Sequence, residues 1–217
     1  MAKRSNFTTL FIEKLSELRL EVAAQMNGKI INYTKIAKDV GIDDKTVKSY
    51  YSILEDTLIG FFLEGFEHSF RKRLSIKPKF YFFDVGVVRS LARLLSVPPV
   101  PGTAFYGENF EHFLVLECVK LRDLYKSEYR FSYLKTKDDA EVDLVVERPG
   151  DRLLFIEMKS SDCVTKESLR SFIQLTRDFG DCEAVCLSED PIERKIEHVL
   201  VLPWMIGLKR YFTKGQL

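Results

Sequence analysis

Residues 140–159 read AEVDLVVERPGDRLLFIEMK, and this stretch decides the fold of the second half of the chain. Its first eight residues alternate polar and apolar side chains, which predicts a strand with Asp143 on the face opposite the apolar one. A Pro-Gly turn leads into a second predicted strand, 153–159, on which Glu157 and Lys159 share a face because they are two residues apart. If the strands pair as a hairpin, the two carboxylates approach each other.

These three side chains suit metal-assisted chemistry on a phosphate. Two adjacent carboxylates form a site for a hard cation such as Mg²⁺. A neighbouring lysine can position or deprotonate a water and stabilise charge on a phosphate. The sequence therefore predicts a magnesium site at Asp143 and Glu157, beside Lys159. The rival interpretation is a surface hairpin whose charges are only solvated.

The surrounding pattern predicts an α/β domain with a central mixed sheet. Its order is helix, three strands, helix, strand, followed by a strand-like run and an amphipathic tail. The predicted elements are a helix over 107–124, strands over 129–135, 140–147 and 153–159, a helix over 165–178, a strand over 182–188 and a run over 197–203.

This arrangement resembles the core of the PD-(D/E)XK nucleases, the restriction-endonuclease-like fold, over roughly residues 105–205. The resemblance implies that Asp143 and Glu157 are metal ligands and that Lys159 is the catalytic lysine. Val142 stands before Asp143, where the family pattern has proline, a substitution that is common in this fold. The resemblance also leaves open a nuclease fold that is kept as a binding scaffold without turnover.

A glutamate of the first helix would complete such a site. Glu111, in the sequence Gly107-x-x-Phe110-Glu111, fits the family position best. Helical periodicity also points Glu117 towards the sheet, and Glu108 is a third candidate. Gln174 lies on the later helix, where some relatives of this fold place a glutamine near the site.

The first half of the chain has the layout of a winged helix-turn-helix domain. Residues 33–40 predict a short helix that Gly41 ends, and a longer helix is predicted over 44–58. Two predicted strands, 59–66 and 79–85, flank a basic loop, as in a winged helix. Further helices are predicted over 7–26 and 86–95.

Seven basic residues of this half are candidate nucleic-acid contacts. They are Lys45, Lys48, Arg71, Lys72, Arg73, Lys77 and Lys79. Such a stripe can neutralise several phosphates, so we expect DNA to bind here. The alternative is a protein–protein module, because winged helices often serve as such modules and Asp43, Asp44 and Asp56 disfavour a DNA backbone.

The two parts of the 217-residue chain differ in charge. Residues 1–95 hold 16 basic and 11 acidic side chains, whereas residues 96–217 hold 17 and 21. Three prolines and a glycine in 96–103 predict a linker between a domain over 1–95 and a domain over 104–217. The absence of a long apolar run or a signal peptide, with only four cysteines, predicts a reduced, cytoplasmic protein without a membrane anchor.

Several longer motifs extend across both halves. They are NYTKIA (32–37), TVKSY (46–50), PKFYFFDVG (78–86), GENFE (107–111), AEVD (140–143) and IEMKSS (156–161). In these motifs the chain is similar to the C-terminal part of a family of prokaryotic AAA-type ATPases, in which an ATPase module precedes a winged helix and a nuclease-like domain. The sequence has no G-x-x-x-x-G-K-[ST] motif, so the resemblance implies no ATP hydrolysis by this chain.

The leading hypothesis is a nucleic-acid-binding protein with a Mg²⁺-dependent phosphodiesterase site. The first alternative is a non-catalytic DNA- or protein-binding module that localises or assembles an ATPase, supplied by a partner or by a missing N-terminal module. A second alternative is an antitoxin-like or transcriptional regulator that acts through the winged helix alone.

Overall fold

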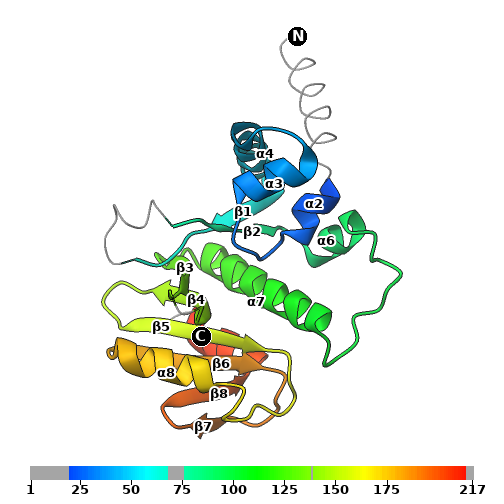
Figure 1. The fold of residues 1–217 in the computed structure, drawn as a ribbon. Helices are drawn as coiled ribbons and strands as arrows, with labels where there is room; N and C mark the ends of the chain where they lie inside the picture. The colour runs from blue at the N-terminus through cyan, green and yellow to red at the C-terminus, as the bar shows by residue number, and fades with distance from the viewer. Residues whose placement is uncertain (1–19, 68–75, 138, 214–217) are drawn as a thin grey trace. The chain divides into compact units, whose positions relative to one another are not determined.

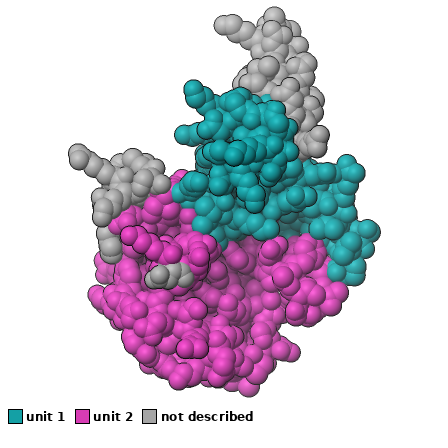
Figure 2. Space-filling view, in the orientation of Figure 1, with its two compact units in different colours: residues 1–63, 77–98 teal, residues 64–76, 99–217 magenta. Residues whose placement is uncertain are grey.

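The structure is a computed structural model that describes residues 20–67, 76–137 and 139–213 (Figure 1). The chain forms two compact units, the first from residues 1–63 and 77–98 and the second from residues 64–76 and 99–217 (Figure 2). Helices and strands occur in both units, so the predicted α/β class is confirmed.

Local sequence signals set the helices of the first unit. Helix α3, Tyr33–Val40, begins where the Asn32 side chain accepts a hydrogen bond from the Lys35 N–H, and it ends at Gly41, whose φ is +80°. Asp43 caps helix α4, Asp44–Asp56, by accepting a hydrogen bond from the Thr46 N–H at 3.0 Å. Both helices were predicted, and both are confirmed. The unit also contains α2 (Leu20–Gln25), α4 (Asp44–Asp56), β1 (Gly60–Leu63), β2 (Lys79–Phe82) and α6 (Val85–Leu91).

The strands β1 and β2 form a two-stranded antiparallel sheet, and side chains of β2 belong to the hydrophobic core of this unit. Gly60 pairs with Phe82 and Leu63 pairs with Lys79. A side chain at Gly60 would not fit, because its Cβ would lie 2.4 Å from Phe80 Cζ. Phe80 packs edge-to-face on Tyr51 of α4, which joins the sheet to the helices.

The second unit is built on a six-stranded mixed sheet with the order β3-β4-β5-β6-β8-β7. Strands β3, β4 and β5 are antiparallel, β5, β6 and β8 are parallel, and β7 is antiparallel to β8. The predicted mixed sheet is therefore present. Its elements are α7 (Ala104–Leu124), β3 (Arg130–Lys135), β4 (Glu141–Glu147), β5 (Leu153–Lys159), α8 (Arg170–Phe179), β6 (Cys182–Ser188), β7 (Arg194–Ile196), β8 (Val199–Pro203) and α9 (Trp204–Phe212).

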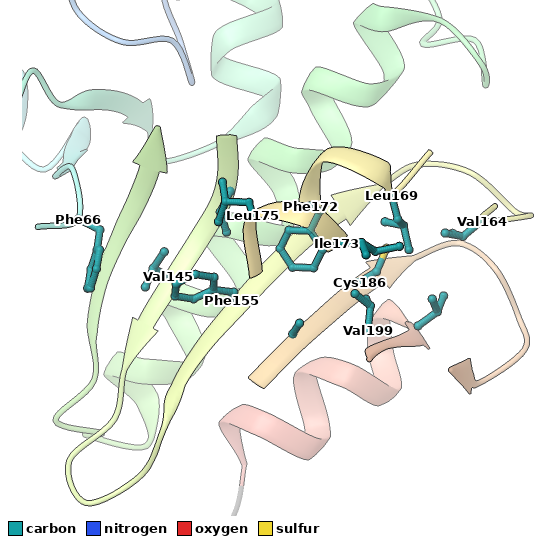
Figure 3. Packing of buried hydrophobic residues seen from close by; sticks show 13 residues of the cluster. Phe66, Val145, Phe155, Val164, Leu169, Phe172, Ile173, Leu175, Cys186 and Val199 are labelled. Carbon is teal, nitrogen blue, oxygen red and sulfur yellow. The ribbon is translucent and has the colours of Figure 1, made fainter. Parts of the chain in front are cut away.

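Helices α7 and α8 lie on opposite sides of β5 (Figure 1). The cluster beneath α8 is wholly apolar and joins the helix to four strands of the sheet (Figure 3). It contains Phe66, Val142, Val145, Phe155, Val164, Leu169, Phe172, Ile173, Leu175, Ala184, Cys186, Val199 and Val201. Burial of this surface fixes which face of each strand the helix covers.

The pairing of β4 with β3 contains an irregularity at Asp143. Ser132 pairs with Val145 and Leu134 pairs with Val142, so one residue of β3 faces Asp143 and Leu144 of β4. Such a bulge reverses the alternation of the strand from that point. Accordingly, Val142 and Val145, three residues apart, both pack beneath α8. The strict alternation that we expected along β4 is therefore wrong.

Some predicted boundaries differ from the observed ones. The strand predicted over 59–66 ends at Leu63, and the Phe66 N–H instead donates to the Tyr133 carbonyl of β3 at 2.6 Å. The three-residue strand β7 was not predicted. Residues 7–19 of the first predicted helix lie outside the described residues. None of the helices that the structure describes has the length and apolarity to cross a bilayer.

Candidate functional site

The candidate site lies at the carboxyl end of β5, where the apolar row beneath α8 becomes polar. Phe155, Glu157 and Lys159 alternate along one face of the strand. Lys159 Nζ lies 2.6 Å from Glu157 Oε1, so the two charges form an ion pair. On the parallel neighbour β6, Cys186 pairs with Glu157 and Ser188 pairs with Lys159.

Asp143 joins this pair from β4. Its Oδ2 accepts a hydrogen bond from the Met158 N–H at 2.7 Å. The regular pairing of β4 with β5 ends at Leu144 and Ile156. The Asp143 side chain therefore takes the place of a backbone acceptor just where the two strands separate. Asp143 thus bonds to the backbone between Glu157 and Lys159, and its charge acts on Lys159, while the predicted approach of its carboxylate to that of Glu157 stays a prediction.

Burial and neighbouring charges perturb both members of the ion pair. Burial raises the pKa of Glu157 above its ordinary value, Lys159 opposes this, and the carboxylates of Glu111 and Glu141 add to it. Partial burial acts to lower the pKa of Lys159, but the carboxylates of Glu157 and Asp143 outweigh it and raise that pKa. A pair of this kind, with perturbed pKa values, marks a functional-site candidate.

The structure separates the three glutamates of α7. Glu111 is partly buried, and its charge acts on Glu157. Glu108 is exposed, whereas Glu117 forms an ion pair with Lys120 at 2.9 Å. Of the three predicted alternatives, Glu111 is therefore the one that contributes to the electrostatics of Glu157.

A divalent cation is compatible with the side chains present. Glu157 Oε2 is buried and has no hydrogen-bond partner, so this carboxylate oxygen could serve as a ligand. The acidic side chains near Glu157 offer carboxylate oxygens, which are the ligands that hard cations prefer. No group of three or more His, Cys, Asp or Glu in the described part of the chain is arranged as a metal cluster. Mg²⁺ is commonly held by one or two carboxylates with water and substrate phosphate, which Asp143 and Glu157 could provide.

Sequence reasoning missed Glu141, Ser188 and Cys186 as neighbours of the site. Glu141 raises the pKa of Glu157 and lies 3.8 Å from the Lys135 ammonium. Its position two residues before Asp143 was a usable signal. The Ser188 hydroxyl is fully buried and has no hydrogen-bond partner, and the Cys186 thiol is buried and free. Their pairing with β5 depends on strand register, which the sequence alone does not give.

The predicted nucleic-acid contacts fall into three groups. Lys45 and Lys48 are exposed on α4, and Lys77 is exposed before β2. Lys79 is only 3% exposed, so its ammonium is not available to a phosphate. The predicted contacts Arg71, Lys72 and Arg73 lie outside the described residues.

Two family comparisons match separate parts of the chain. Residues 12–97 match a family described as "Domain of unknown function (DUF8612)". Residues 106–206 match another described as "Domain of unknown function (DUF4143)". The second match covers the strands that carry Asp143, Glu157 and Lys159.

Similarity to curated proteins extends across both regions. The chain is 24% identical to "Uncharacterized protein Rv2008c" of Mycobacterium tuberculosis and to "Uncharacterized protein Mb2031c" of Mycobacterium bovis, over 78% of its own length. The alignment covers 40% of each mycobacterial protein, so this chain spans about two fifths of these relatives. No solved structure matches the chain.

Proposed function

We propose that the protein is a nucleic-acid-binding phosphodiesterase that uses a divalent metal ion, with a PD-(D/E)XK-type second unit and a winged-helix first unit. One observation carries the proposal. A buried glutamate, Glu157, has one oxygen paired with Lys159 and the other without a hydrogen-bond partner, and the Asp143 carboxylate accepts a hydrogen bond from the N–H of Met158, the residue between them in sequence. This set of charges suits a cation and a phosphate together.

Asp143 and Glu157 would hold the ion, which when bound supplies positive charge to the phosphate and lowers the pKa of a water. Lys159 keeps its ammonium beside Glu157 and has further N–H groups to bind a phosphate oxygen or orient the attacking water. Hydrolysis forms a bond from the water oxygen to phosphorus, breaks the bond to the leaving oxygen and transfers a proton to it. Glu111 strengthens the local negative potential that attracts a cation.

The first unit would provide most of the binding to nucleic acid. Lys45 and Lys48 project from the second helix of a helix-turn-helix pair, which is the position that enters the major groove in proteins of this class. Lys77 would add a phosphate contact next to the β1–β2 sheet. Binding through these ammonium groups must weaken steeply as salt rises.

A cleavage assay tests the proposal. Purified protein is incubated with plasmid and with single-stranded DNA in Mg²⁺, Mn²⁺ or EDTA. We expect cutting that requires metal, that Asp143→Ala and Lys159→Ala abolish, and that Glu111→Gln reduces. Glu117→Gln is the matched control, because this residue lies on the same helix but pairs with Lys120. Cleavage that survives Asp143→Ala would contradict the proposed site.

The relatives support a second candidate function. The mycobacterial proteins extend well beyond the matched region, in keeping with a chain that works beside a further module. In this alternative the chain is a non-catalytic module that localises or assembles an ATPase on DNA or protein. It predicts DNA or protein binding that neither EDTA nor Asp143→Ala changes, without cleavage.

A further inference from the structure

A cavity of about 890 Å³ lies beside α8 in the second unit, separate from the carboxylate pair. Cavities that bind small organic groups typically measure about 300–1,000 Å³. Its lining combines apolar and aromatic side chains with polar and charged ones. The apolar lining consists of Phe66, Leu134, Ala140, Leu175 and Phe179, and the polar lining of Glu67, Thr136, Arg170, Ser171, Gln174 and Asp178.

Two phenyl rings, those of Phe66 and Phe179, line the cavity. Phe66 and Phe179 lie 6.1 Å apart between ring centroids at an angle of 61°, and both pack against Phe155. Figure 3 labels Phe66 and Phe155 among the side chains of the apolar cluster beneath α8. Every nucleobase has a π-face that can stack on such rings.

The polar groups favour a neutral ring with N–H donors over an anion. The Gln174 amide nitrogen donates to both oxygens of Asp178, at 2.9 and 3.0 Å. This leaves the Gln174 carbonyl oxygen and the carboxylate as acceptors for ring or exocyclic N–H groups. Glu67 and Asp178 repel a phosphate from the interior of the cavity.

A phosphate would instead bind to Arg170 at the rim of the cavity. Its guanidinium is exposed and has no hydrogen bond or ion pair in the part of the chain that the structure describes. Because α8 connects the parallel strands β5 and β6, it runs antiparallel to them, and Arg170 lies towards the end of β5 that carries Lys159. Ala140 also lines the cavity and immediately precedes Glu141, whose charge reaches Glu157.

We propose that this cavity holds one unpaired nucleobase of the nucleic acid, with the adjoining phosphate on Arg170. This inference rests on the proposed function and gives it a substrate class, since a base within an intact duplex cannot enter a cavity of this kind. The substrate of the second unit is therefore single-stranded or locally unpaired.

Equilibrium binding in EDTA tests this without any cleavage. Fluorescence anisotropy compares a labelled single-stranded oligonucleotide with the same strand carrying abasic sites. One stacked base is worth roughly tenfold in affinity, so we expect the full chain to prefer the strand with bases by about that factor. The double variant Ser171→Leu/Gln174→Leu adds apolar bulk to the cavity lining and removes an acceptor, and it should lose most of this preference.

The matched control is Lys120→Leu/Asp123→Leu, which has the same spacing on exposed positions of α7, leaves the net charge unchanged and lies outside the cavity lining. It should keep the preference. A single change, Arg170→Ala, should weaken binding of both strands and flatten the salt dependence.

Equal affinity for both strands, no binding of either, or an unchanged preference in the Ser171→Leu/Gln174→Leu variant would overturn the proposal. These outcomes do not depend on the metal site. If the base-binding proposal fails, metal-dependent cleavage that Asp143→Ala abolishes would still support the proposed nuclease site. If the protein prefers the strand with bases in EDTA but never cleaves, the base-binding cavity is supported and the nuclease function is rejected.

Discussion

Replacing Lys159 by methionine isolates the energetics of the buried pair. The Lys159→Met variant keeps most of the apolar stem and removes the ammonium that lies 2.6 Å from Glu157 Oε1. Removing one partner of a fully buried pair costs about 3–5 kcal/mol. The Lys159 side chain is 33% exposed and that of Glu157 is 10% exposed, so solvent screens part of the loss. We expect a cost of about 2 kcal/mol, or a fall in Tm of about 4–8 °C at neutral pH.

The stability loss of Lys159→Met should depend on pH in a definite direction. Without Lys159, the pKa of Glu157 rises further, because burial and the charges of Glu111 and Glu141 are no longer opposed. A carboxyl group whose folded pKa is raised makes the folded state bind a proton more tightly than the unfolded state. Stability is then lost as pH rises from the ordinary pKa of 4.5 through the raised value. The deficit of Lys159→Met should therefore be complete at high pH and shrink on acidification.

Thermal unfolding followed by circular dichroism in EDTA, from about pH 5 to about pH 8, measures both effects. The double variant Lys159→Met/Glu157→Gln provides the control, because replacing both charges leaves no unpaired ion and should recover most of the stability. Two results would refute the reasoning. One is a Tm of Lys159→Met equal to that of the wild type, and the other is a double variant as unstable as the single one.

Substitutions at three further positions have definite expected outcomes. Asp143→Asn keeps an oxygen for the Met158 N–H and should cost less than about 1 kcal/mol by urea unfolding, while Asp143→Ala should cost about 1–2 kcal/mol; equal losses would count against that hydrogen bond. Ser188→Ala removes a buried hydroxyl without a partner and should leave stability within about 0.5 kcal/mol of the wild type or raise it, so a large loss would reveal a contact. Gly60→Ala places a Cβ 2.4 Å from Phe80 Cζ and should lower stability by about 1–3 kcal/mol in the same assay, which an unchanged midpoint would disprove.

Local signals predicted much of the secondary structure. The helix over 33–40 has an asparagine at its start and Gly41 at its end, and both residues act on backbone groups within one turn. The spacing of Glu157 and Lys159 likewise places them on one face of a strand whatever the strand pairs with.

Features that depend on distant pairing were not predictable. The bulge at Asp143 arises from pairing of β4 with β3, and the contact of Phe66 with Tyr133 joins segments far apart in the sequence. The burial of Lys79 follows from its place between β1 and the backbone at Ile30, although in sequence it reads as one more cation of a basic run. The register that sets Ser188 beside Lys159 also needs the folded sheet.

Calorimetric titration of the metal-free protein with Mn²⁺ tests the central claim most directly. The site predicts saturable binding that weakens as pH falls, because a proton competes for Glu157, whose pKa is raised by its burial. Glu157→Gln and Asp143→Asn should abolish this binding, and Glu117→Gln should leave it unchanged. Absence of saturable binding in the wild type, or undiminished binding in Glu157→Gln, would contradict a cation site at these carboxylates.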